Sequence, residues 1–147
     1  MTRAATSDEF VQGQLALQPL FVKAARLLGQ TAGLLMLARA GSKPERQRSH
    51  LQIARAQWRE LQDDFRGLGS PADAVPSHRA VGATIERLGL LLDRLDRRFL
   101  ASLGEDGELA SLLTELAATR RVLQSGSCPH GGLTIVDMAG ACCAASH

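Results

Sequence analysis

The segment HRAVGATIERLGLLLDRLDRRF, which spans residues 78–99, decides the fold expected for this chain. Residues that can face a core recur in it at alternating spacings of three and four, namely His78, Val81, Ile85, Leu88, Leu92, Leu95 and Phe99. In an α-helix this spacing brings the side chains onto one face. The segment therefore predicts an amphipathic helix whose apolar face packs against other helices.

Three further segments carry the same spacing, and each supplies one apolar seam. The first seam comprises Leu17, Phe21, Ala24, Leu28, Thr31 and Leu35. The second comprises Leu51, Ala54, Trp58, Leu61, Phe65 and Leu68. The last comprises Leu109, Leu112, Leu116, Thr119 and Leu123. Because no comparable period-two alternation precedes the C-terminal tail, the chain is expected to be all-α, an antiparallel up-down-up-down four-helix bundle.

The helix boundaries are predicted from capping and breaking residues. We expect helices at about residues 7–40, 44–68, 71–103 and 107–124, joined by short connections. Capping boxes are expected at Thr6 with Glu9, Ser42 with Glu45, and Ser70 with Asp73. Helices are expected to end at Gly41, Gly67, Gly69, Gly104 and Gly126. Pro19 is expected to kink or split the first helix, and Pro76 to do the same near the start of the third.

Length and composition narrow the class of protein. The 147 residues favour one bundle over residues 1–125, followed by an irregular tail over residues 126–147. A formal net charge of +2 gives no general reason for binding to nucleic acid or membranes. The N-terminus lacks the apolar stretch of a secretory signal, and the longest apolar run, residues 27–38, is shorter than the ~20 residues of a membrane span. A cytoplasmic protein without a membrane partner is therefore expected.

The second predicted helix carries a basic stripe, formed by Arg48, Arg55, Arg59 and Arg66. Acidic residues interleave with this stripe, and only 3% of the chain is aromatic, so side chains that could stack on bases are scarce. These features favour a solvated helix face over a nucleic-acid site.

Sequence patterns typical of enzymes are missing from the chain. There is no GxxxxGK[ST] phosphate loop, no HExxH motif, no CxxC motif and no ExxH pair of the kind that holds iron in a bundle. Two Ser-His pairs are sequence neighbours, whose side chains diverge on a helix, so a hydrolytic triad is not expected. The sequence therefore favours a non-enzymatic binding or interaction protein.

The tail has an unusual concentration of metal-ligating residues. All three cysteines and two of the four histidines lie there: Cys128, His130, Cys142, Cys143 and His147. Thiolate and imidazole together suit Zn²⁺ or Cu⁺. The up-down topology brings the start of the third helix and the end of the fourth to one end of the bundle. Cys128 and His130 are therefore expected near His78, with a tail cysteine completing a metal site and His50 at the far end.

Two alternative functions remain open from the residues. Cleavage after Gly132 would release residues 133–147, an arrangement that resembles the leader and core of modified-peptide precursors. The spacing of His78, Gly82 and Ala83 resembles that of the small residues after the phosphorylatable histidine in histidine-phosphotransfer bundles. This chain departs from that pattern, because Val81 stands where such domains usually place Lys and Ala80 where they place Leu.

The first predicted helix carries a second apolar stripe beside its main seam, formed by Leu20, Leu27 and Leu34. A helix with more apolar surface than one bundle needs indicates association with another chain. The sequence therefore predicts a helical interaction module that uses its helix faces to bind a protein partner or to form a homo-oligomer.

Overall fold

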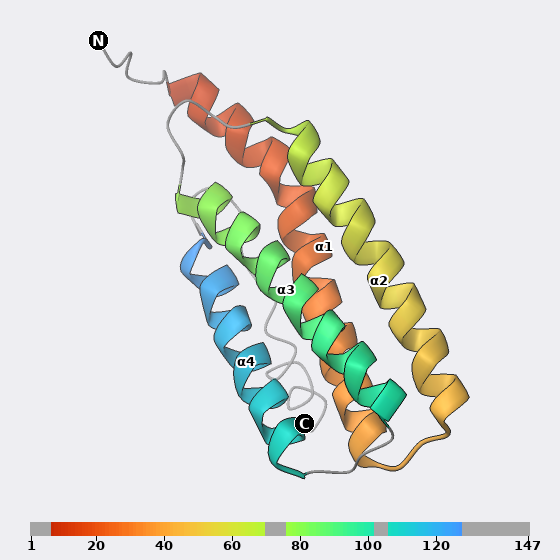
Figure 1. Ribbon diagram of the computed structural model, residues 1–147. Coiled ribbons are helices and arrows are strands. Elements are labelled where there is room, and N and C mark those ends of the chain that lie inside the picture. Colours follow the sequence, from red (N-terminus) through yellow and green to blue (C-terminus); the bar gives the residue numbers. More distant parts are fainter. Residues whose placement is uncertain (1–6, 70–75, 102–105, 128–147) are drawn as a thin grey trace, which may run out of the picture.

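The computed structural model describes residues 7–69, 76–101 and 106–127, and this part of the chain is helical without strands. The four helices are α1 (Ser7–Arg39), α2 (Pro44–Gly67), α3 (Pro76–Ala101) and α4 (Asp106–Ser125). They lie side by side in one elongated bundle (Figure 1). The all-α four-helix fold predicted from the four seams is confirmed.

Successive helices run in opposite directions, as the colours of Figure 1 show. Side-chain contacts follow the same antiparallel register. Lys23 of α1 contacts Glu60 of α2, and Trp58 of α2 contacts the backbone of Ile85 in α3. α1 and α3 each contact all three other helices, whereas α2 and α4 do not contact each other in the described part of the chain. The bundle therefore has a rhombic cross-section, with α2 and α4 at its far corners.

The predicted seams supply most of the core. All six seam residues of α1 and all five of α4 are buried, as are the five seam residues of α3 from Val81 to Leu95. The seam of α2 is less complete, because Trp58 and Phe65 are half-buried and Leu68 is 40% exposed. α2 therefore contributes less of its predicted seam to the core than the other three helices do.

One prediction about α1 is wrong. Leu20, Leu27 and Leu34 do not form a free stripe, because they are only 4%, 2% and 3% exposed within the bundle. The reason is the position of α1 between three other helices, which requires an apolar face wider than a single seam. The second stripe is therefore part of the core and is not the surface that the sequence suggested.

The start of α2 differs from the predicted capping box. Lys43 occupies the N-cap position without a side-chain hydrogen bond, and Pro44 is the first helical residue. Proline suits that position because its fixed φ is already helical and its missing N–H would have no partner there. Ser42 therefore lies outside the helix, where its Oγ and carbonyl oxygen both accept hydrogen bonds from Gln47 Nε2, at 2.9 and 2.8 Å.

The other predicted boundaries have mixed outcomes. α1 is one continuous helix through Pro19, so the expected splitting is wrong. Pro19 lies on the exposed side of α1, where water can solvate the carbonyl that loses its partner. Gly41 and Gly69 follow helix ends with φ of 70° and 71°, as glycine allows. The boxes at Thr6 and Ser70, and the expected stop at Gly104, lie outside the described residues.

Two glycines of α3 allow α2 to approach closely. Trp58 Nε1 donates a hydrogen bond of 2.7 Å to the carbonyl oxygen of Ile85, which fixes the indole against α3. A Cβ at Gly89 would lie only 2.6 Å from Trp58 Cζ2. One at Gly82 would lie 3.1 Å from Phe65 Cζ. Aromatic rings of α2 therefore occupy the space that side chains at these positions would fill.

α1 is also the most apolar helix of the bundle. By length and composition, Leu15–Arg39 could cross a membrane, with a mean hydropathy of 1.3. The core helix of a bundle meets the same criterion, and α1 contacts the three other helices. The many apolar residues of α1 are thus explained by its central position in the core, although the other helices leave one face of α1 uncovered.

Candidate functional site

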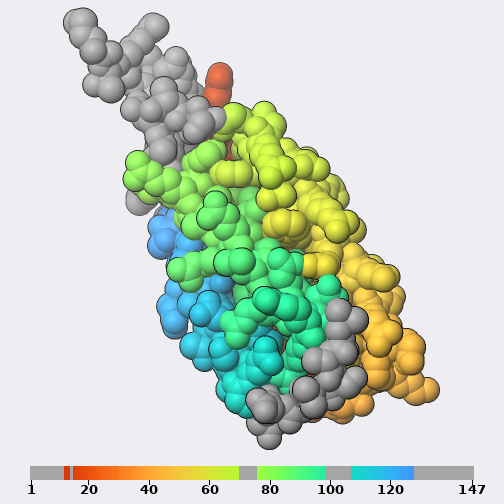
Figure 2. Space-filling view, in the orientation of Figure 1, coloured from red at the N-terminus to blue at the C-terminus, as the bar shows by residue number. Residues whose placement is uncertain are grey.

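The uncovered face of α1 is unusually apolar. Eight exposed residues follow one another on it at spacings of three and four, and we call them the α1 face: Leu15, Pro19, Val22, Arg26, Gly29, Gly33, Met36 and Ala40. Leu15, Val22 and Met36 are 65%, 43% and 60% exposed. Arg26 is the only charged residue of the α1 face. Figure 2 shows the opposite side of the molecule, where α2, α3 and α4 hide most of α1.

A groove lies between the second half of α1 and the first half of α2. It encloses about 610 Å³ and is open to solvent, and we call it the α1–α2 groove. Its lining consists of Gln30, Gly33, Leu34, Met36, Leu37, Ala40, His50 and Ile53. A Cβ at Gly33 would meet nothing within 4 Å, so the missing side chain leaves this part of the groove open. Ile53 of α2 is 51% exposed and continues the apolar surface beyond α1.

One buried polar atom also belongs to the groove lining. Gln30 Oε1 is out of contact with solvent and has no hydrogen-bond partner within the described structure. An amide oxygen in that state carries a desolvation cost. The walls of the groove are largely apolar, a composition that fits a binding site.

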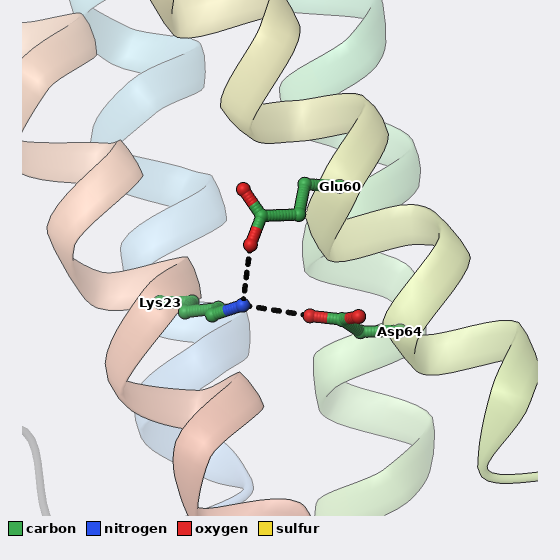
Figure 3. A network of polar contacts seen from close by, with 3 residues as sticks. All are labelled: Lys23, Glu60 and Asp64. Carbon is green, nitrogen blue, oxygen red and sulfur yellow. Dashed lines mark hydrogen bonds and ion pairs between the residues drawn. The ribbon is translucent and has the colours of Figure 1, made fainter.

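Beyond the groove, towards the start of α1, a polar network joins α1 to α2 (Figure 3). Lys23 Nζ donates hydrogen bonds to Asp64 Oδ2 at 2.7 Å and to Glu60 Oε1 at 2.9 Å. The hydrogen bond to Asp64 and then that to Glu60 raise the pKa of Lys23 above its ordinary value, because both favour the ammonium form. All three side chains are solvent-exposed, so the network fixes the register of the two helices and adds little stability.

The predicted metal site has only one ligand among the described residues. His78 lies at the start of α3, with its ring centroid 4.5 Å from that of Phe65. Its Nε2 is buried without a described hydrogen-bond partner. The five remaining predicted ligands, Cys128, His130, Cys142, Cys143 and His147, lie outside the described residues. Within residues 7–69, 76–101 and 106–127, no three His, Cys, Asp or Glu side chains come together as a metal site.

The end of α4 lies beside the start of α3. A Cβ at Gly126 would overlap that of Ala80 and would lie 3.2 Å from Ser77 Cα. Gly126, which precedes Cys128 by two residues, therefore lies within one helical turn of His78. His50 lines the α1–α2 groove near the opposite end of α3, in agreement with its expected separation from His78.

The alternative functions gain no support from these residues. A histidine that receives a phosphoryl group must present a reactive ring nitrogen to a partner, whereas Nε2 of His78 is buried. The proposed cleavage point after Gly132 lies outside the described residues. In the basic stripe of α2, Arg55 pairs with Asp93 and Asp96 of α3, and Arg66 pairs with Asp63, so neighbouring carboxylates offset part of its charge.

Comparison of the chain with protein-family models, with curated proteins and with solved structures finds no match. The surface of the bundle is therefore the basis for a functional proposal.

The α1 face was not predicted from the sequence, because the predicted apolar positions were those that continue the core. A signal was nevertheless present. Leu15, Val22, Gly29 and Met36 recur every seven residues, a spacing typical of a helix that packs along another helix. The absence of acidic residues from this face was a second signal.

Proposed function

We propose that this protein is a non-enzymatic interaction module that binds an apolar segment of a protein partner along the α1 face and in the α1–α2 groove. One observation carries the proposal: an open groove of about 610 Å³ with largely apolar walls, on a bundle whose four helices already share one buried core. Contiguous exposed apolar surface of this kind marks interaction sites in soluble proteins. A helix with an apolar stripe is the natural occupant of a groove between two helices.

A neutral dye whose fluorescence rises in apolar surroundings tests this site directly. We expect the native protein to bind the dye, and Met36→Lys and Ile53→Lys each to weaken that binding at least about fivefold, since each places a charge in the groove. Both side chains are mostly exposed, so neither change should unfold the bundle. Circular dichroism of each variant checks that the helices remain.

Leu90→Lys is the matched control for the dye experiment. Leu90 is 66% exposed on α3 and lies outside the α1–α2 groove. Dye binding to this variant should equal that of the native protein. Dye binding that is lost with Leu90→Lys but retained with both groove variants would contradict the proposed site.

A second candidate function is binding of Zn²⁺ or Cu⁺ by His78 together with cysteine and histidine residues of the tail. It is supported by the buried Nε2 of His78, which has no hydrogen-bond partner among the described residues, and by the contact of Gly126 with α3. Imidazole nitrogen and thiolate sulfur would supply a tetrahedral donor set. This function is compatible with the first, because His78 lies apart from the α1–α2 groove.

Metal analysis of anaerobically purified full-length protein tests the second candidate. We expect about one equivalent of metal per chain, and we expect Cys128→Ser and His78→Ala each to lower the bound amount because each removes a ligand. Ser49→Ala, an exposed residue of α2, should leave it unchanged. A full equivalent of metal in both Cys128→Ser and His78→Ala would exclude this site.

A further inference from the structure

We propose that the partner on the α1 face is a second copy of this chain, bound about a two-fold axis so that the two α1 helices pack antiparallel. The proposal rests on the proposed function, because it names the occupant of the same surface. Four features carry it: the area that a second copy covers, the heptad spacing of the face, the close approach that Gly29 and Gly33 allow, and the position of Arg26.

The area that a second copy covers is sufficient for a small specific interface. In an antiparallel pair centred between Gly29 and Gly33, the two α1 helices overlap from Val22 to Ala40, which is about 27 Å at 1.5 Å per residue. With α2 alongside, at a helix spacing of about 10 Å, the surface is about 20 Å wide. The covered area is thus about 540 Å² per chain, or about 1,100 Å² for the pair, slightly above the ~1,000 Å² that a specific interface should clear. A short peptide would cover only a part of this surface, whereas a second copy covers it from Val22 to Ala40.

The sequence of the α1 face follows a heptad. Leu15, Val22, Gly29 and Met36 form one line of residues, and a parallel line four residues further on comprises Pro19, Arg26, Gly33 and Ala40. Two lines at this spacing form the contact seam of paired helices. In the middle of the seam, Cβ atoms at Gly29 and Gly33 would meet nothing within 4 Å, so another helix can approach the backbone closely.

An antiparallel pair centred between Gly29 and Gly33 places the glycines of one copy against those of the other. In that register Gly29 lies opposite Gly33 of the second copy, and Val22 lies opposite Ala40. Met36 lies opposite Arg26, whose aliphatic stem can cover the methionine while its guanidinium reaches solvent. The surface is therefore complementary to itself under two-fold rotation, as an isologous interface requires.

The position of Arg26 selects the antiparallel arrangement. In a parallel pair in register, the two Arg26 side chains would face each other and repel. In the antiparallel pair they are separated by about ten residues of rise, or about 15 Å, which exceeds the screening length at physiological salt. The only charge of the α1 face thus opposes one arrangement and permits the other.

Sedimentation equilibrium of the full chain over a wide range of concentrations tests the proposal. We expect the mass of two chains at high concentration, and we expect Gly33→Leu to raise the dimer Kd at least about tenfold by filling the central notch. Space around Gly33 is open within one chain, so this change should not unfold the bundle. Gly13→Leu, an exposed glycine of α1 outside the α1 face, should leave the Kd unchanged.

Two variants of opposite charge at Met36 test the register. Because Met36 lies opposite Arg26 of the second copy, Met36→Glu should keep the Kd within about threefold, whereas Met36→Lys should raise it at least about tenfold. Equal weakening by both variants would overturn the antiparallel register.

The remaining outcomes separate this proposal from the proposed function. If the chain stays monomeric but binds the dye in the groove, the proposed dimer is wrong and the proposed interaction site is retained. A chain that stays monomeric, and whose dye binding increases when residues 128–147 are removed, overturns the proposal in favour of the tail as occupant. A dimer that persists in Gly33→Leu overturns the proposal, because its interface then lies elsewhere.

Discussion

Replacement of Phe21 by alanine is expected to lower the free energy of unfolding by about 4 kcal/mol, within the range of about 3–5 kcal/mol for phenylalanine removed from a core. Phe21 is fully buried on the inward face of α1. Because α1 contacts all three other helices, the cavity left by the ring would open in the middle of the bundle. A loss of this size is a large fraction of the stability of a small domain.

Urea unfolding followed by helical circular dichroism measures this loss, and Val22→Ala is its control. Val22 follows Phe21 directly but is 43% exposed on the α1 face. Its truncation should change the free energy of unfolding by less than about 1 kcal/mol at concentrations where the chain is monomeric. Similar losses for the two variants would mean that α1 does not present these faces to core and solvent.

Substitution of Gly89 by alanine is expected to lower the free energy of unfolding by about 2 kcal/mol, although alanine is the better helix former. The new Cβ would lie 2.6 Å from Trp58 Cζ2, and the indole cannot move away without breaking its hydrogen bond to the Ile85 carbonyl. Overpacking of this kind costs about 1–3 kcal/mol and outweighs the gain in helix propensity. Trp58 is the only tryptophan, so its emission reports the displacement directly.

Gly29→Ala is the matched control, because Gly29 lies in α1 with open space around its Cα. The same substitution there should raise the free energy of unfolding by about 0.5–1 kcal/mol, again measured on the monomer. In a Trp58→Phe background, Gly89→Ala should lose most of its cost, because the smaller ring frees the space that Cβ needs. A cost that is unchanged in that background would show that the indole is not its cause.

The core of this protein could be predicted from its sequence because it depends mainly on the regular spacing of apolar residues along each helix. Leu88 and Leu112 belong to seams with helical spacing, so their side chains are expected to lie in the core of a bundle. Both are fully buried. The width of the apolar face on each helix could not be predicted in the same way. Leu27 and Val22 are equally apolar, yet the first is buried and the second is exposed. Which of them lies inside depends on how many neighbours α1 has, a property of the assembled bundle.

The candidate site was harder to predict, for a related reason. Gly29 and Gly33 become informative only when the structure shows that nothing fills the space beside them. The site residues predicted from the sequence included the tail cysteines and His78, because cysteine and histidine can be recognised as metal ligands from residue type alone. The position of His78 near the start of the third helix was predicted from the sequence. Its contact with Phe65 could not be predicted, because it depends on how α2 packs against α3.

The rhombic arrangement has a further consequence for how the chain reaches its native state. Each helix packs against the next one in sequence, so α1–α2, α2–α3 and α3–α4 can form as hairpins with short closing loops. Contacts between near neighbours in sequence favour folding on the order of microseconds to milliseconds. Only the contacts of α1 with α3 and α4 require distant segments to meet. The contacts between helices that are not neighbours in sequence therefore all involve the helix that bears the α1 face.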